Sequence, residues 1–124
     1  MKISKFTDLE AWKEAHRLTL LIYQITEKFP QSERYGLTTQ LRRAAVSIES
    51  CIAEGFSRYS YKDRAHFYYE SRGSLAEVQS QCITSKDLTY LKENDFIEIF
   101  NQTEKVSLIL GGLIRSTTNL SNKK

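Results

Sequence analysis

The stretch from residue 37 to residue 55 decides the fold class of this chain. It reads Leu-Thr-Thr-Gln-Leu-Arg-Arg-Ala-Ala-Val-Ser-Ile-Glu-Ser-Cys-Ile-Ala-Glu-Gly. Its apolar residues recur at steps of three and four, a period that gathers them on one helix face: Leu37, Leu41, Ala44, Ala45, Ile48 and Ile52. The pattern predicts a helix over about residues 34–54, with Gly55 as the left-handed residue that follows its end.

The same period occurs on both sides of this stretch. It predicts three further helices, over about residues 8–28, 60–89 and 95–118. Pro30 and the polar residues after it separate the first two helices, and the polar tail 119–124 is expected to be disordered. Four long helices with short links predict a single domain over residues 1–124, an all-α, antiparallel up-down-up-down four-helix bundle.

Small residues and one capping signal add local detail. Ser60, with Asp63 three positions later, resembles a capping box at a helix start. Gly73 lies inside a predicted helix, where glycine is costly, so it is expected to permit a close contact. The pair Gly111-Gly112 is expected to fray or kink the end of the last helix.

Composition limits the class of protein. The 124 residues are 40% hydrophobic and 27% charged, with five Gly and one Pro, which favours a soluble helical domain over a turn-rich β-fold. The formal net charge of +3 is compatible with a nucleic-acid partner without requiring one. No signal peptide or membrane span is visible, so a cytoplasmic protein without a membrane partner is expected.

Few residues suggest catalysis. No glycine-rich phosphate loop is present, and the two cysteines, Cys51 and Cys82, lack the spacing of a zinc or redox site. Neither His16 nor His66 has a partner that spacing alone can nominate. We therefore expect no enzyme activity, no cofactor, no metal and no small-molecule substrate. A nuclease assembled from distant segments is the remaining enzymatic alternative.

The segment 56–72 combines aromatic and basic residues. It holds six of the fourteen aromatic residues, Phe56, Tyr59, Tyr61, Phe67, Tyr68 and Tyr69. It also holds four cations, Arg58, Lys62, Arg64 and Arg72. Such a mixture suits RNA, because guanidinium groups bind phosphate and flat rings stack on bases. It also suits ordinary packing within the bundle, and composition favours a third interpretation, a protein–protein interface, over both.

The pair Arg42-Arg43 is the second basic feature. Adjacent helical residues point about 100° apart, so one arginine can face a neighbouring helix while the other stays solvated. A half-buried arginine needs a carboxylate, and Glu54 and Glu77 are the candidates. Ion pairing between helices and direct phosphate contact are both open interpretations.

Three ordered segments resemble a known family. They are Gln40–Ile48 with Ile52–Gly55 and Arg58, Phe6–Trp12 near the start, and Gly73–Glu77. Together they resemble the four-helix-bundle proteins encoded within 23S rRNA intervening sequences, the S23 family, over about residues 6–115. The accessory variability proteins of diversity-generating retroelements are similar to this family as well.

The resemblance carries expectations of its own. It implies a homopentamer with a basic surface that binds RNA, or a reverse transcriptase with its RNA, and no enzymatic activity. The residues that match the family pattern are Arg42, Arg43, Glu54, Arg58, Gly73 and Glu77. Two positions depart from the pattern: the family often has Asn where this chain has Cys51, and an acidic residue where it has Gln79.

These observations lead to one primary hypothesis and one alternative. The primary hypothesis is a non-enzymatic oligomeric bundle that binds RNA through Arg42, Arg43, Arg58, Lys62, Arg64 and Arg72. Interface or structural roles are expected for Trp12, Glu54, Gly55, Phe67, Gly73 and Glu77. The alternative is a protein-interaction scaffold, for example for a reverse transcriptase, that does not contact RNA directly.

Overall fold

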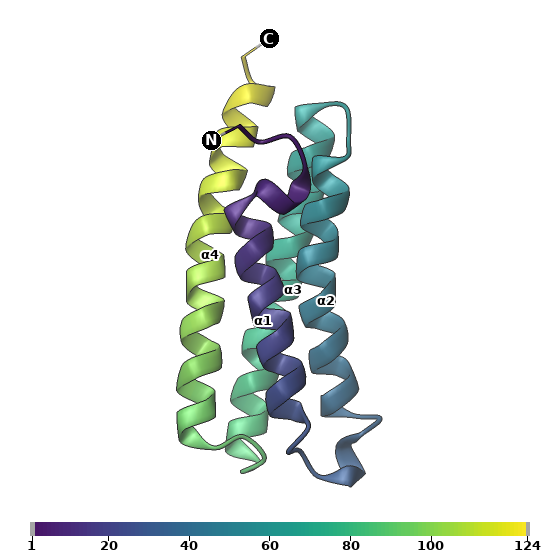
Figure 1. The fold of residues 1–124 in the computed structure, drawn as a ribbon, viewed down its shortest axis with the longest axis vertical. Helices are drawn as coiled ribbons and strands as arrows, with labels where there is room; N and C mark the ends of the chain where they lie inside the picture. The colour runs from purple at the N-terminus through teal and green to yellow at the C-terminus, as the bar shows by residue number, and fades with distance from the viewer. Residues whose placement is uncertain (1, 124) are drawn as a thin grey trace.

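The computed structural model describes residues 2–123 and consists of four long helices. They are α1 (Glu10–Thr26), α2 (Leu37–Phe56), α3 (Tyr61–Asp87) and α4 (Glu93–Ser121), with short 3-10 turns η1 (Phe6–Asp8) and η2 (Gln31–Glu33). Residues 2–123 contain no strand. The four helices form a ring in which α1 packs against α2, α2 against α3, α3 against α4 and α4 against α1. Successive helices run in opposite directions (Figure 1). The predicted all-α, antiparallel up-down-up-down bundle is confirmed.

The termini and the connections between helices lie at the two ends of the bundle. Both termini and the α2–α3 connection lie at one end of the bundle, and the α1–α2 and α3–α4 connections lie at the other (Figure 1). Within residues 2–123, none of the helices carries an apolar run of membrane-spanning length.

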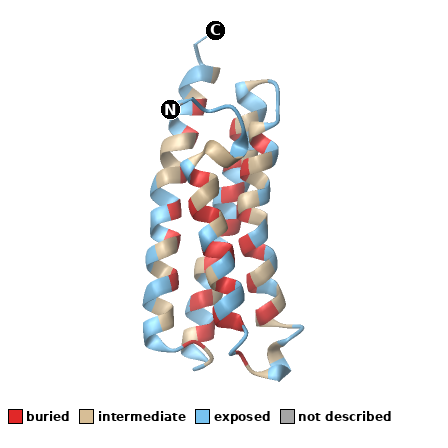
Figure 2. Ribbon diagram, in the orientation of Figure 1, coloured by how far each residue is buried: buried red, intermediate tan, exposed pale blue. Residues whose placement is uncertain are grey.

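The apolar stripes meet along the axis of the bundle (Figure 2). All four helices contribute fully buried side chains to one core, among them Leu18, Ile22, Leu41, Ile48, Ile52, Tyr68, Val78, Ile99 and Leu110. Burying each large aliphatic side chain contributes roughly 1.5–3 kcal/mol, so the paired stripes supply most of the stability.

Small and hydroxyl residues bring α2 and α3 together. The Ser47 and Ser74 hydroxyls lie 2.9 Å apart across this interface. The Ser71 hydroxyl donates a hydrogen bond to the carbonyl oxygen of Ile48 at 2.8 Å. These bonds satisfy hydroxyl groups that would otherwise be buried without partners, which would cost roughly 1–3 kcal/mol each.

Both helical glycines of this region differ from expectation. Gly55 was predicted to follow the end of its helix, but α2 continues to Phe56 and no described glycine has positive φ. The physical reason is contact: a Cβ on Gly55 would lie 2.8 Å from Tyr68 Cε1. Gly73 was predicted to permit a close contact, and this is wrong within the chain because nothing lies within 4 Å of its missing Cβ.

The start of α3 agrees with the sequence, whereas its end has an unusual residue. The Ser60 hydroxyl accepts a hydrogen bond from the backbone N–H of Asp63 at 3.1 Å, as the capping signal predicted. After Asp87 the chain turns sharply at Thr89, which has φ 67°. The turn lets the Tyr90 N–H bond the carbonyl oxygen of Ser85 at 2.9 Å.

The last helix is longer than its sequence suggested. The predicted disordered tail is wrong for residues 119–121, because α4 continues to Ser121 and buries Ile114 and Thr117 against the bundle. Lys124 lies outside the described residues. Gly111 and Gly112 do not interrupt α4, whose buried residues Leu110 and Ile114 flank them. The first helix begins later than predicted, because Phe6–Asp8 form the 3-10 turn η1.

Candidate nucleic-acid interface

The segment 56–72 begins at one end of the bundle, where α2 passes into α3, and continues for about three turns along α3. We call this region the arginine–aromatic end and define it as Phe56, Arg58, Tyr59, Tyr61, Lys62, Arg64, Phe67, Tyr69 and Arg72. Arg58 lies 4.5 Å above the ring of Phe67 and pairs with the Glu54 carboxylate, Nη2 to Oε2, at 2.8 Å. Glu54 and Phe67 thus hold the Arg58 guanidinium in place.

Arg64 joins the α2–α3 connection to the helix that follows it. Its Nε donates a hydrogen bond to the carbonyl oxygen of Arg58 at 2.8 Å. Its guanidinium lies 5.0 Å from the ring of Phe56 and 5.6 Å from that of Tyr61. Only the Nε position is used by this bond, so the two terminal nitrogens can still donate to an incoming acceptor.

The cations of this end are mostly without carboxylate partners. Arg72 lies 4.8 Å above the ring of Tyr69. Within residues 2–123, no ion pair involves Lys62, Arg64 or Arg72. Tyr59 is fully exposed, and the Tyr61 and Tyr69 side chains are partly so. The end therefore presents unpaired positive charge beside exposed aromatic rings.

Arg42 belongs to a different part of the surface. It packs against α1, where its Nε donates to the Thr26 hydroxyl at 2.9 Å and its guanidinium lies 4.6 Å above the ring of Tyr23. Its carboxylate partner is Glu27, 3.5 Å from Nη2. The expectation that Glu54 or Glu77 would serve is wrong, because Arg42 leaves α2 on the side of α1, whereas both glutamates lie on the side of α3.

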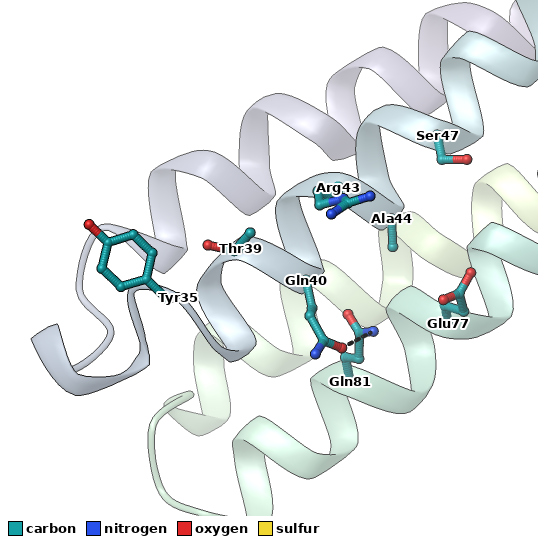
Figure 3. A pocket seen from close by; sticks show the side chains of 8 residues that line it. All are labelled: Tyr35, Thr39, Gln40, Arg43, Ala44, Ser47, Glu77 and Gln81. Carbon is teal, nitrogen blue, oxygen red and sulfur yellow. Dashed lines mark hydrogen bonds between the residues drawn. The ribbon is translucent and has the colours of Figure 1, made fainter.

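Arg43 occupies a third place, a groove between the outer sides of α2 and α3 (Figure 3). We call it the α2–α3 groove; it has a volume of about 500 Å³ and is lined by Tyr35, Thr39, Gln40, Arg43, Ala44, Ser47, Glu77 and Gln81. Its exposed Arg43 is fifteen positions before Arg58, about 20 Å along the bundle. The six predicted nucleic-acid-binding cations are thus divided among several surfaces.

Of the predicted structural residues, Trp12 lies at a packing contact. Trp12 is half-buried against the core and stacks on His16, with ring centroids 4.8 Å apart and planes 9° from parallel. The His16 Nδ1 lies 2.9 Å from Glu49 Oε2 on α2. Sequence spacing did not reveal this pair, because its members are on different helices.

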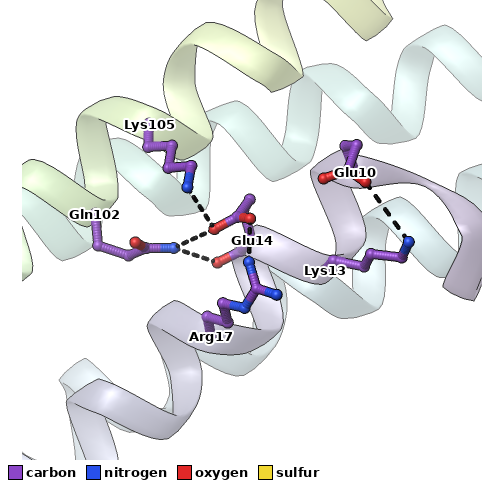
Figure 4. A network of polar contacts seen from close by, with 6 residues as sticks. All are labelled: Glu10, Lys13, Glu14, Arg17, Gln102 and Lys105. Atoms are coloured by element: carbon purple, nitrogen blue, oxygen red, sulfur yellow. Dashed lines mark hydrogen bonds and ion pairs between the residues drawn. The ribbon is translucent and has the colours of Figure 1, made fainter.

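A buried glutamate on α1 was also missed. Glu14 is only 3% exposed, and its carboxylate accepts a hydrogen bond from Gln102 Nε2 at 3.0 Å (Figure 4). Arg17 and Lys105 pair with it as well. The hydrogen bond from Gln102, followed by the charges of Arg17 and Lys105, lowers the pKa of Glu14 despite its burial. Its position beside Ala11, Ala15 and Leu18 in the apolar stripe was the available sequence signal.

The described residues offer little for metal or thiol chemistry. Within residues 2–123, no group of three His, Cys, Asp or Glu side chains could hold a metal ion. Cys51 and Cys82 are free thiols. Burial raises the pKa of the Cys82 thiol to about 12 and also raises that of Cys51. Both thiols are held in their protonated, less reactive form.

Comparison with known proteins identifies relatives of this bundle. The family model described as 23S rRNA-intervening sequence protein matches residues 7–112. A crystal structure of a protein of unknown function from the S23 ribosomal protein family of Bacteroides thetaiotaomicron superposes with a TM-score of 0.75 at 15% identity. That match covers 84% of this chain and 97% of the other. No curated protein matches the chain.

Proposed function

The chain belongs to the 23S rRNA-intervening sequence protein family, and from this premise we propose that it is a non-enzymatic RNA-binding protein acting as an oligomer. The arginine–aromatic end is the main contact surface in this proposal. The oligomer is a homopentamer, and a reverse transcriptase with its RNA is one candidate partner.

The observation that carries the proposal is the set of unpaired cations at this end. Because Lys62 and Arg72 are exposed and have no carboxylate partner among residues 2–123, phosphate binding breaks no ion pair within that range. Arg72 is already held over the Tyr69 ring, so less side-chain freedom is lost when it binds. The fully exposed Tyr59 offers a face on which an unpaired base can stack.

Assembly supplies the affinity that a single chain lacks. A net charge of +3 per chain gives a weak field by itself. Several copies in one assembly contact several phosphates of one RNA at once, and each further contact is intramolecular. The proposal therefore requires strong salt dependence, because every phosphate contact releases counterions from the RNA.

The test compares two double variants by fluorescence anisotropy with a labelled RNA hairpin between 50 and 200 mM salt. Lys62→Ala with Arg72→Ala removes two charges from the arginine–aromatic end and is expected to weaken binding about tenfold or more. It should also reduce the salt slope by about two, one for each lost phosphate contact. The matched control, Arg34→Ala with Lys92→Ala, removes the same charge from exposed positions at the opposite end and should bind as the wild type.

An isotherm that does not change with salt, or equal losses in both double variants, would count against phosphate contact at this end. Light scattering on the same samples measures the assembly. A monomer at micromolar concentration would contradict the oligomeric part of the proposal.

A second candidate function, a protein-interaction scaffold without RNA contact, is favoured by apolar residues on α4. Leu108 is 78% exposed and Ile97 is 48% exposed, about three turns apart on the same face of α4. If this face of α4 binds a second copy of the chain or another protein, the double variant Leu108→Ser with Ile97→Ser disrupts assembly or partner binding. In that case Arg58→Ala and Arg64→Ala leave any RNA retention unchanged.

A further inference from the structure

The α2–α3 groove contains polar groups that the bundle leaves without partners. Within residues 2–123, neither Arg43 nor Glu77 takes part in an ion pair. The two side chains nevertheless leave adjacent helices toward the same groove (Figure 3). The neighbouring Arg42, by contrast, is engaged by Thr26, Tyr23 and Glu27.

A third group points to a missing hydrogen-bond donor. The side-chain oxygen of Gln81 is buried and has no hydrogen-bond partner, while its nitrogen donates to Gln40 Oε1 at 3.4 Å. An acceptor left in this state costs roughly 1–3 kcal/mol, and the cost is recovered when the Gln81 amide turns toward the groove and accepts from a ligand there. Gln81 lines the groove next to Glu77, so two acceptors lie on the α3 side and the cationic donor of Arg43 lies on the α2 side.

The size of the groove suits a small ligand. Its volume of about 500 Å³ lies within the range of small-molecule sites, and Ala44 gives part of its wall an apolar surface. The Tyr35 ring, 90% exposed, lies at one end of the groove.

The ligand must present donors to one side and acceptors to the other. Guanine has this pattern: its N1–H and N2–H₂ groups are adjacent donors, and its O6 and N7 are acceptors that arginine recognises. Adenine has no pair of adjacent donor groups on one edge, and uracil offers one donor flanked by acceptors. A carboxylate accepts from both guanine donors at once.

We propose that the α2–α3 groove binds an unpaired guanine base of the RNA, with Glu77 and Gln81 accepting from its N1–H and N2–H₂ edge and Arg43 donating to its O6 and N7. This inference rests on the proposed RNA-binding function and adds base specificity to it. Glu77 in the groove follows Arg72 of the arginine–aromatic end by five positions, about 8 Å along α3, so one RNA strand can reach both regions.

The experiment measures binding of single-stranded heptanucleotide RNAs that differ only at the central base within uridines. Guanine at the centre should bind about tenfold more tightly than adenine. The heptanucleotide with inosine at the centre, which lacks the 2-amino group, should bind with an affinity between those of the guanine and adenine RNAs. Glu77→Gln should remove most of the preference for guanine, because an amide cannot accept from both donors. Glu70→Gln, an exposed carboxylate change on the same helix, is the matched control and should keep it.

Two outcomes overturn the inference while leaving the proposed function intact. One is equal binding of guanine and adenine by the wild-type protein. The other is an Arg43→Ala variant that weakens all heptanucleotides by the same factor, which indicates phosphate contact alone. If no RNA binds at any salt concentration, the proposed function and the guanine site both fail. Circular dichroism of each variant establishes that the exposed substitutions leave the helices intact.

Discussion

Gly55 on α2 and Tyr68 on α3 lie so close that a methyl group on the glycine would meet the tyrosine ring at 2.8 Å. The same position would come 2.9 Å from Phe67 Cβ and 3.1 Å from the carbonyl oxygen of Arg64. Tyr68 is fully buried, so its ring has no free space into which it can move. Glycine at this position sets how near α3 approaches α2.

We therefore predict that Gly55→Ala lowers the free energy of unfolding by about 1–3 kcal/mol, because overpacking outweighs the helical preference for alanine. Gly73→Ala is the matched control: it is also a helical glycine but has open space around it, and it should raise the free energy of unfolding by roughly 0.5–1 kcal/mol. Urea denaturation of both variants measures the difference. Equal stability of the two would show that the contact at Gly55 relaxes without cost.

The second prediction concerns the turn after α3. Thr89 has φ 67°, a left-handed conformation that a β-branched residue adopts at a cost of about 1–2 kcal/mol. Thr89→Gly should raise the free energy of unfolding by about 0.5–1 kcal/mol, since glycine removes that cost but loses more entropy on folding. Leu88→Gly, at φ −81°, should instead lower it. Thermal unfolding of the two variants measures both changes. A Thr89→Gly variant that is less stable than the wild type would contradict the expected cost of the left-handed threonine.

The third prediction follows from the buried carboxylate of Glu14. Because folding lowers the pKa of Glu14 below its ordinary value of 4.5, the unfolded chain binds this proton more readily. The stability that Glu14 contributes is complete above about pH 4.5 and is lost as the pH falls through the folded-state pKa. Gln102→Ala, which removes the main hydrogen bond, should lower the free energy of unfolding at pH 7 by about 1–3 kcal/mol.

Glu14→Gln should also flatten the acid limb of the stability profile below about pH 5. The control is Glu10→Gln, a more exposed carboxylate that lies 3.5 Å from Lys13 on the same helix. Its variant should keep the wild-type profile. Chemical denaturation at several pH values measures both, and an unchanged acid limb in Glu14→Gln would refute the assignment.

The fourth prediction uses the two thiols. Burial raises the pKa of Cys82 to about 12, so almost no thiolate exists at pH 8 in the folded protein. In a Cys51→Ser variant, alkylation of Cys82 should be at least about a hundredfold slower than in denaturant. Cys51, which is only partly buried, should react at an intermediate rate in the Cys82→Ser variant. Rapid labelling of Cys82 under native conditions would mean that α3 opens frequently.

The helices were predictable because their signals are local. The period of Leu41, Ala45 and Ile48 lies within one helix, and the Ser60 cap needs only residues three positions apart. The meaning of Gly55 was not predictable in this way. A glycine that follows an apolar helical pattern commonly marks the end of a helix, so the sequence does not distinguish the two roles. Only the position of Tyr68 on the next helix shows that Gly55 is a packing residue.

The polar contacts were the hardest to predict, because their partners are distant in sequence. Glu14 and Gln102 are 88 positions apart, so their contact depends on how α1 and α4 are placed around the ring. The 100° between adjacent helical residues predicted different surroundings for Arg42 and Arg43. The pairing of Arg42 with Glu27 could be predicted only by knowing that α1 lies on the Arg42 side of α2. The distribution of the six cations over several surfaces depends on helix placement for the same geometric reason.

An even number of antiparallel helices returns the chain to the end from which it started, and this affects how the protein should be handled. An affinity tag or fluorescent reporter attached to either terminus is located beside the α2–α3 connection, where it crowds the proposed RNA contact (Figure 1). Labels inserted in the α1–α2 or α3–α4 connection lie at the far end of the rod and leave that surface free. Binding assays should therefore use protein from which the tag has been removed, or a reporter in the α3–α4 connection, because Tyr35 of the α1–α2 connection lines the α2–α3 groove.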